Sequence, residues 1–220
     1  MYRQILREPR PATSSKVLLH RDSKKDAALS STEHFRDLIR KPQTGNLKVF
    51  VTRVPLPRLF DGMVSEGKRL LSMGVDAVVA LDGEHTAVDF PATHVVLAKD
   101  IRFKKSAFQE LDYEAILRRS PEVVIIDNLL HVNLSVSGSE MRYHTVRDLL
   151  DHGISVVISA YSAFGNNLKT AFEYVSGNFP DRFDRRAKLP DDDIFTLVFT
   201  PKKTIRSADF ASSVGCISPQ

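Results

Sequence analysis

The residues best suited to chemistry lie around one apolar run, Pro121-Glu-Val-Val-Ile-Ile-Asp127-Asn128. Four consecutive β-branched residues closed by Asp127 predict a strand buried on both faces, as in the centre of a parallel sheet. In open α/β folds, ligands bind at the carboxyl edge of the sheet, and an aspartate there can hold the Mg²⁺ of a nucleotide. The competing interpretation is an aspartate that caps a loop amide or the next helix.

Other polar side chains follow predicted strands without forming a known catalytic pattern. Asp82 and His85 follow one strand, but no second histidine stands at the spacing of a metal-binding helix. Ser159 lies near a strand end without the flanking glycines of a nucleophile elbow. Cys216 is the single cysteine, which excludes a disulfide or a cysteine metal site within one chain. We therefore predict no catalytic residue and no metal site.

Apolar periodicity indicates the elements that position these residues. It predicts strands over 47–51, 75–81, 121–127, 154–160 and 194–200, with a short edge strand over 93–97. It predicts helices over 58–73, 112–119, 140–152 and 168–175, and a polar loop before the second of these. Strands that alternate with helices at this spacing predict an α/β fold, a three-layer sandwich with a mainly parallel central sheet in a single domain.

Charge is unevenly distributed along the 220 residues. The net charge is +4, but residues 1–46 hold ten Lys/Arg against five Asp/Glu, so this segment carries +5 and the rest −1. Acidic residues interrupt the basic ones, which favours a solvated leader over a nucleic-acid arm. We expect a flexible basic leader over 1–46, with little structure before residue 31 and a short helix near 31–41. The domain then spans 47–206, and a tail spans 207–220.

The sequence lacks the signals of membrane insertion and secretion. No apolar run approaches the roughly 20 residues that cross a bilayer, and the first residues lack the apolar centre of a secretory signal. We therefore expect a soluble, cytoplasmic protein with no membrane span.

Several short motifs occur in a recognisable order. The motifs are Leu47-Lys-Val-Phe-Val, Glu66-Gly67-Lys68-Arg69-Leu70-Leu71, Gly74-Val75-Asp76, Asp127 with His131 and Asn133, Arg142, Leu149-Leu150-Asp151, Gly153-Ile154 and Pro180-Asp181-Arg182. Together they resemble the N-terminal cytoplasmic domain of the KdpD-type potassium-sensing histidine kinases over about two thirds of the chain. The resemblance implies a P-loop-NTPase-like fold.

The resemblance breaks at the phosphate loop. That family carries a Gly-rich P-loop ending in Gly-Lys-Thr, and here the equivalent run is 52–60, with Arg58, Leu59 and Phe60 in place of the final three residues. A P-loop needs glycines so that backbone N–H groups can surround phosphate, a Lys for the β/γ oxygens and a hydroxyl for Mg²⁺. Asn128 replaces the acid that follows the metal-binding Asp in the family. We therefore predict a degenerate P-loop without nucleotide hydrolysis.

The resemblance implies a non-catalytic regulatory or input domain of a two-component system that acts through contacts with a signalling protein and not with nucleic acid. Two alternatives stay open: a weak P-loop ATPase or kinase with an unorthodox loop, and a nucleotide- or anion-sensing module. No cofactor is expected under the first interpretation, whereas ATP or another nucleotide would bind under the alternatives. The candidate binding residues are Arg53, Arg58, Asp127, His131, Asn133 and Arg142.

Overall fold

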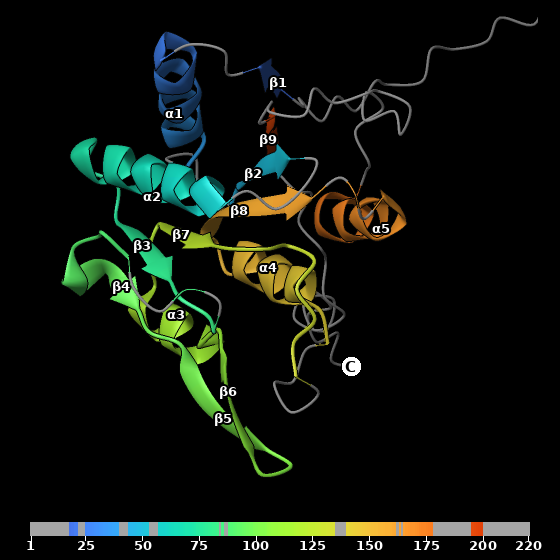
Figure 1. The fold of residues 1–220 in the computed structure, drawn as a ribbon. Helices are drawn as coiled ribbons and strands as arrows, with labels where there is room; N and C mark the ends of the chain where they lie inside the picture. The colour runs from blue at the N-terminus through green and yellow to red at the C-terminus, as the bar shows by residue number, and fades with distance from the viewer. Residues whose placement is uncertain are drawn as a thin grey trace, which may run out of the picture.

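The computed structural model describes residues 18–21, 25–39, 44–52, 57–83, 85, 88–134, 140–161, 163, 165–177 and 195–199. Its main sheet has seven strands in the order β1-β9-β2-β8-β7-β3-β4 (Figure 1). These strands are β1 (Leu18–Arg21), β2 (Leu47–Thr52), β3 (Ala77–Ala80), β4 (Val95–Val96), β7 (Val123–Ile126), β8 (Ser155–Tyr161) and β9 (Phe195–Phe199). The pairs from β2 to β4 are parallel, whereas β9 is antiparallel to both of its neighbours. The predicted α/β domain with a mainly parallel sheet is confirmed.

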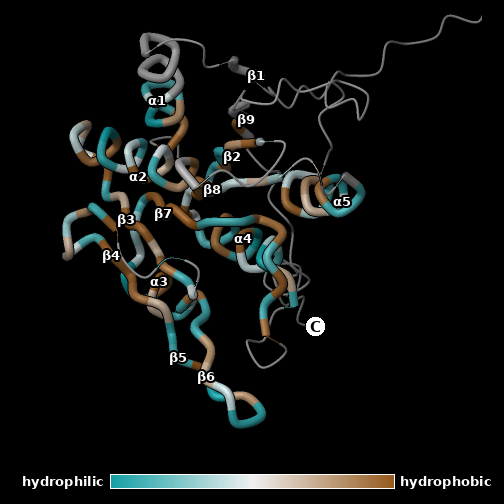
Figure 2. The backbone as a smooth tube through the Cα atoms, in the orientation of Figure 1, coloured by the Kyte–Doolittle hydropathy of each residue, from teal (hydrophilic) through white to brown (hydrophobic). Residues whose placement is uncertain are grey.

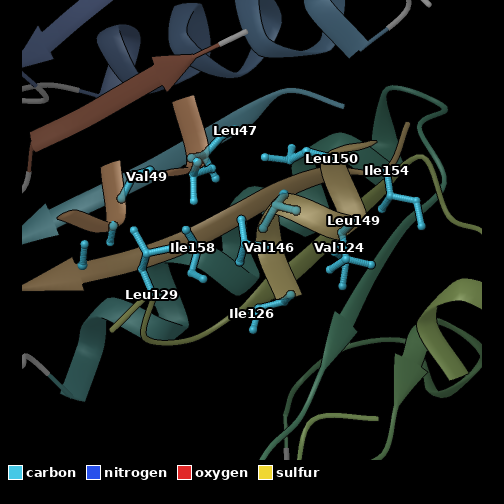
Figure 3. Packing of buried hydrophobic residues seen from close by; sticks show 14 of the residues in the cluster. Leu47, Val49, Val124, Ile126, Leu129, Val146, Leu149, Leu150, Ile154 and Ile158 are labelled. Carbon is cyan, nitrogen blue, oxygen red and sulfur yellow. The ribbon is translucent and has the colours of Figure 1, made fainter. Parts of the chain in front are cut away.

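Helices cover both faces of this sheet. They are α1 (Lys25–Ile39), α2 (Pro57–Ser72), α3 (Tyr113–Arg119), α4 (Arg142–Asp151) and α5 (Gly165–Ser176), with a short 3-10 turn, η1 (Ala92–His94). Side chains alternate along each strand, so Val124 and Ile126 belong to the apolar cluster that holds residues of α3, α4 and α5, and Figure 3 shows them beside α4. Val123 and Ile125 belong to the cluster on the other face, with residues of α1 and α2. The central strands are therefore apolar on both faces, as their unbroken β-branched sequence predicts.

Helix ends follow local signals in the sequence. Asp112 caps α3, because its side chain accepts a hydrogen bond from the backbone N–H of Ala115. Gly74 follows α2 with φ +77° and Gly153 follows α4 with φ +81°, a left-handed conformation that favours glycine. These ends lie within a few residues of the predicted ones.

Two segments differ from the sequence-based expectation. The expectation of little structure before residue 31 is wrong within the described residues, because β1 pairs with β9 and α1 begins at Lys25. Residues 1–17 and 207–220 lie outside the described residues. The predicted polar loop before α3 contains a hairpin of β5 (Lys99–Phe103) and β6 (Ser106–Glu110), which forms a separate two-stranded sheet. Both misses involve strand pairing that local periodicity does not reveal.

Figure 2 shows the resulting distribution of hydropathy, with apolar residues along the central strands and hydrophilic residues at the tip of the β5–β6 hairpin. No helix in the described part of the chain has the length and apolar character needed to cross a membrane.

Candidate functional site

Polar side chains meet at the carboxyl edge of the parallel strands. Asp127 directly follows β7, Ser159 lies in the neighbouring β8, and Asp82 and His85 follow β3 on the other side. The carboxyl ends of parallel strands share one edge of a sheet, which is where ligands bind in open α/β folds.

Asp127 lies at the centre of this edge and is 6% exposed. The Ser159 hydroxyl donates to Oδ1 of Asp127, and Nε2 of His85 lies 2.8 Å from Oδ2. Burial alone would raise the pKa of the Asp127 carboxyl, but the hydrogen bonds from His85 and Ser159 hold that pKa below its usual range. Asp127 is therefore a buried carboxylate with a donor on each oxygen.

The Phe60 ring covers the His85 end of this group. Phe60 lies in the first turn of α2, and its ring stacks on the His85 imidazole with centroids 3.7 Å apart and planes 7° apart. Phe60 is 7% exposed, and Leu59 beside it is 2% exposed. The start of α2 thus places packed apolar side chains against the polar edge of the sheet.

Arg142, the first residue of α4, is the cation of this edge and is fully buried. Its Nη1 donates to Oδ2 of Asp82 at 3.1 Å and to the backbone carbonyl of Asp127 at 3.0 Å. Its Nε lies 3.4 Å from Oδ1 of Asn133. Nη2 has no hydrogen-bond partner among the described residues. The guanidinium therefore joins the segments after β3 and β7, and the two N–H groups of Nη2 have no acceptor among the described residues.

A second carboxylate links this edge to the hairpin. Glu110, the last residue of β6, is 5% exposed, and its Oε1 accepts from the backbone N–H of Leu134 at 3.0 Å. Its Oε2 lies 3.7 Å from Nε2 of His131. The loop after β7 is thus tied to Arg142 on one side and to the root of the hairpin on the other.

The structure describes four of the six predicted binding residues in full. Asp127, Asn133 and Arg142 share hydrogen bonds, and the backbone N–H of Arg142 donates to the carbonyl of His131 at 2.9 Å. Arg53 lies outside the described residues, as does the side chain of Arg58 at the start of α2. These four residues therefore lie close together. Their binding of a ligand stays a prediction.

Sequence reasoning missed several partners of these residues. The sequence predicts a polar loop around Glu110, and nothing in its local sequence indicates that it meets His131. The pairing of His85 with Asp127 joins residues 42 positions apart. Within the described residues, no group of three or more His, Cys, Asp or Glu side chains has the arrangement of a metal site.

A separate buried ion pair lies under α1. Lys48, in β2, is 1% exposed, and its Nζ lies 2.7 Å from Oε1 of Glu66 in α2. Oε2 of Glu66 accepts from the hydroxyl of Thr32 at 2.6 Å and from Arg69 at 2.7 Å. Burial raises the pKa of Glu66, but Lys48 and these donors outweigh it and lower the pKa. The lone charge in an otherwise apolar strand was the available signal for this pair.

Comparison with known proteins identifies the family. Residues 43–173 match the model of the KdpD family, the osmosensitive K⁺ channel histidine kinase sensor domain. This match covers more than half of the chain, so the protein belongs to that family of sensor domains. The predicted relation to the sensor domains of potassium-responsive histidine kinases is confirmed.

The curated relatives are longer proteins. The chain is 29% identical to the sensor protein KdpD of Mycobacterium tuberculosis over 152 residues, which cover 67% of this chain and 17% of that protein. It is 28% identical to the sensor protein KdpD of Escherichia coli over 168 residues, which cover 70% of this chain and 19% of that protein. It is 28% identical to the putative sensor protein KdpD of Synechocystis over 167 residues, which cover 72% of this chain and 44% of that protein. The chain thus spans less than half the length of each of these relatives.

Proposed function

We propose that this chain is a non-catalytic regulatory input domain that acts through protein contacts in a potassium-responsive two-component pathway. The observation that carries the proposal is the stack of Phe60 on His85, which in turn pairs with Asp127. The Phe60 ring stacks on the imidazole that pairs with Asp127, the carboxylate after β7 that could serve Mg²⁺ at this edge. The partner is expected to be a signalling protein in the cytoplasm.

The proposal includes a degenerate P-loop on a P-loop-NTPase-like fold. Leu59 and Phe60 stand where the family's P-loop has Lys and Thr, and both are buried. Charge-assisted hydrogen bonds contribute roughly 1.5 to 3 kcal/mol each, so the loss of two or three weakens phosphate binding by roughly a thousandfold or more. We expect no tightly bound nucleotide cofactor and no hydrolysis.

The four candidate binding residues that the structure describes in full then have structural roles at this edge. Asp127, His131, Asn133 and Arg142 belong to the hydrogen-bonded group that holds the segments after β3 and β7 together. Arg53 and Arg58 are the cations of the altered loop. Under this proposal, their substitution changes stability or partner binding more than it changes any turnover.

One observation favours a second candidate function, an anion- or nucleotide-sensing module. Nη2 of the fully buried Arg142 has no partner among the described residues, and an anion at this edge would supply an acceptor. A weak ATPase is the related catalytic alternative, which requires Arg53 or Arg58 to replace the P-loop lysine.

Thermal denaturation with a nucleotide panel distinguishes these functions. ATP, ADP, cyclic nucleotides and inorganic phosphate are each tested with and without Mg²⁺, because a ligand that binds the folded state raises its melting temperature. The regulatory proposal predicts no shift at millimolar ligand. A shift that requires Mg²⁺ and ATP would favour the ATPase, and a Mg²⁺-independent shift that Arg142→Met abolishes would favour the sensing module.

A further inference from the structure

The β5–β6 hairpin projects from the body of the domain (Figure 1) and pairs with no other strand among the described residues. Its strands run antiparallel from Lys99 opposite Glu110 to Phe103 opposite Ser106. Nine of its ten strand residues are exposed or half-buried, and Glu110 at the root is the buried one. The hairpin therefore contributes little to the core. The outer edge of β5 pairs with no strand among the described residues, whereas Gln109 of β6 lies against Gly83.

One face of the hairpin carries an apolar stripe. Ile101 is directly opposite Phe108, and Phe103 lies on the same face because side chains alternate along a strand. Phe108 is 40% exposed, and Ile101 and Phe103 are half-buried. The stripe is therefore accessible to a partner as well as to water.

The charges around this stripe are mostly positive. The hairpin carries the four cations Lys99, Arg102, Lys104 and Lys105 against the anions Asp100 and Glu110, which gives +2. Asp100 and Arg102 lie on the other face, where Asp100 accepts a hydrogen bond from Gln109 at 3.2 Å, so the cations next to the stripe are Lys99 and the two lysines of the tip. Glu110 does not offset the cations at the tip, because it is buried at the root beside His131.

The turn at the tip of the hairpin has two lysines in a left-handed backbone conformation that favours other residues. Lys104 and Lys105 form the two-residue turn and have φ angles of +47° and +73°. Such a turn favours Asn-Gly, because lysine has a Cβ that makes the left-handed conformation unfavourable. Non-glycine residues held in this conformation point to a functional role for the side chains.

We propose that the β5–β6 hairpin is a docking arm for an acidic, extended segment of a partner protein. The segment adds to an edge of the hairpin, places apolar side chains on Ile101, Phe103 and Phe108, and pairs its carboxylates with the lysines of the tip. The positive charge disfavours a second copy of the same hairpin as the occupant. This proposal rests on the proposed function as a protein-contact domain and names the chemistry of its partner.

The test uses the full chain and a fluorescein-labelled peptide that alternates Glu with Val and Phe, with matched peptides in which Lys or Gln replaces Glu. Fluorescence anisotropy measures binding to the unmodified chain, to the double variant Lys104→Asn/Lys105→Gly and to Phe108→Ser. Tyr174→Ser on α5 is the matched control, because Tyr174 is also an exposed aromatic residue, at 51%. A duplex DNA oligomer with the same net charge as the Glu peptide is titrated with the same proteins in parallel.

The double variant separates a structural role from a docking role. Asn-Gly suits the turn, so the melting temperature should stay the same or rise, while affinity for the Glu peptide falls by about tenfold because two exposed ion pairs are lost. Phe108→Ser should weaken binding by a similar factor, and Tyr174→Ser should leave it unchanged. The proposal is overturned if the Glu peptide does not bind, if the Lys peptide binds equally well, if the double variant retains full affinity, or if DNA binds more tightly. None of these results depends on MgATP binding, which tests the proposed function separately.

Discussion

At the scale of single residues, two specific donors, His85 and Ser159, stabilise the ionised carboxylate of Asp127 in the folded protein. Asp127→Asn keeps the shape but loses the charge, so we expect the free energy of unfolding to fall by roughly 1.5 to 3 kcal/mol at neutral pH. Urea denaturation measures this loss, with Asp89→Asn as the control because Asp89 lies at the surface.

The same substitution predicts a pH dependence. The folded pKa of Asp127 is lowered, so its stabilising contribution is present above the unfolded value of about 3.9 and is lost as the pH falls through the lower folded pKa. The difference in unfolding free energy between the unmodified chain and Asp127→Asn should therefore shrink below about pH 4. A difference that stays constant or grows on acidification would contradict this assignment.

The pair of Lys48 and Glu66 makes a second prediction at this scale. Glu66→Leu leaves the Lys48 ammonium buried without its carboxylate, which should cost about 3 to 5 kcal/mol of unfolding free energy. Adding Lys48→Met removes that charge and should restore most of the loss. Chemical denaturation of Glu66→Leu, Lys48→Met and the double variant gives the coupling free energy between the two side chains. Equal instability of Glu66→Leu and the double variant would mean that the pair is not the source of the loss.

Single residues also show what the sequence could and could not predict about the site. The position of Asp127 follows from the strand before it, and the structure joins Asn133 and Arg142 to it by hydrogen bonds, while the predicted role of these residues in ligand binding stays a prediction. Glu110 and the pairing of His85 were not predictable, because each depends on contacts between distant loops. The role of Arg58 stays a prediction.

At the scale of elements, apolar periodicity predicts the buried strands and their helices because both faces of the sheet need unbroken apolar residues. It fails for β5–β6, whose strands bury almost nothing and whose Lys-Lys turn carries no turn signal. It also fails for β1, which depends on pairing with β9. Apolar periodicity therefore indicates which elements are buried, and it does not predict elements that bury few side chains.

The segment before β2 gives a prediction at this scale. A chain that begins at Ser31 loses β1 and the first turns of α1 but keeps Thr32 and Phe35, both fully buried. A chain that begins at Leu47 also loses Phe35, whose removal should cost roughly 3 to 5 kcal/mol more. Urea denaturation of both chains checks this order, and equal stability of the two would show that α1 contributes no packing.

At the scale of the whole molecule, the regulatory proposal requires a KdpD-family domain with a parallel sheet whose phosphate loop no longer binds phosphate. Replacing Leu56 and Arg58 with Gly, Leu59 with Lys and Phe60 with Thr restores the loop pattern. Because Leu59 and Phe60 are buried, this variant should be less stable without ligand by several kcal/mol, at roughly 1.5 to 3 kcal/mol for each apolar side chain. Calorimetry should show only partial recovery of ATP affinity, since Asn128 is unchanged. A variant as stable as the unmodified chain would contradict the stabilising role of the buried Leu59 and Phe60 side chains.

The most direct test of the regulatory proposal is a calorimetric titration of the unmodified chain with MgATP. Phe60 stacks on His85, which pairs with Asp127, and under the proposal the loop lacks two or three of the hydrogen bonds that a P-loop makes to phosphate. The account predicts no binding tighter than about millimolar, given a loss of roughly a thousandfold from a micromolar site. Micromolar binding of MgATP would contradict it and would make a nucleotide-binding function the better account.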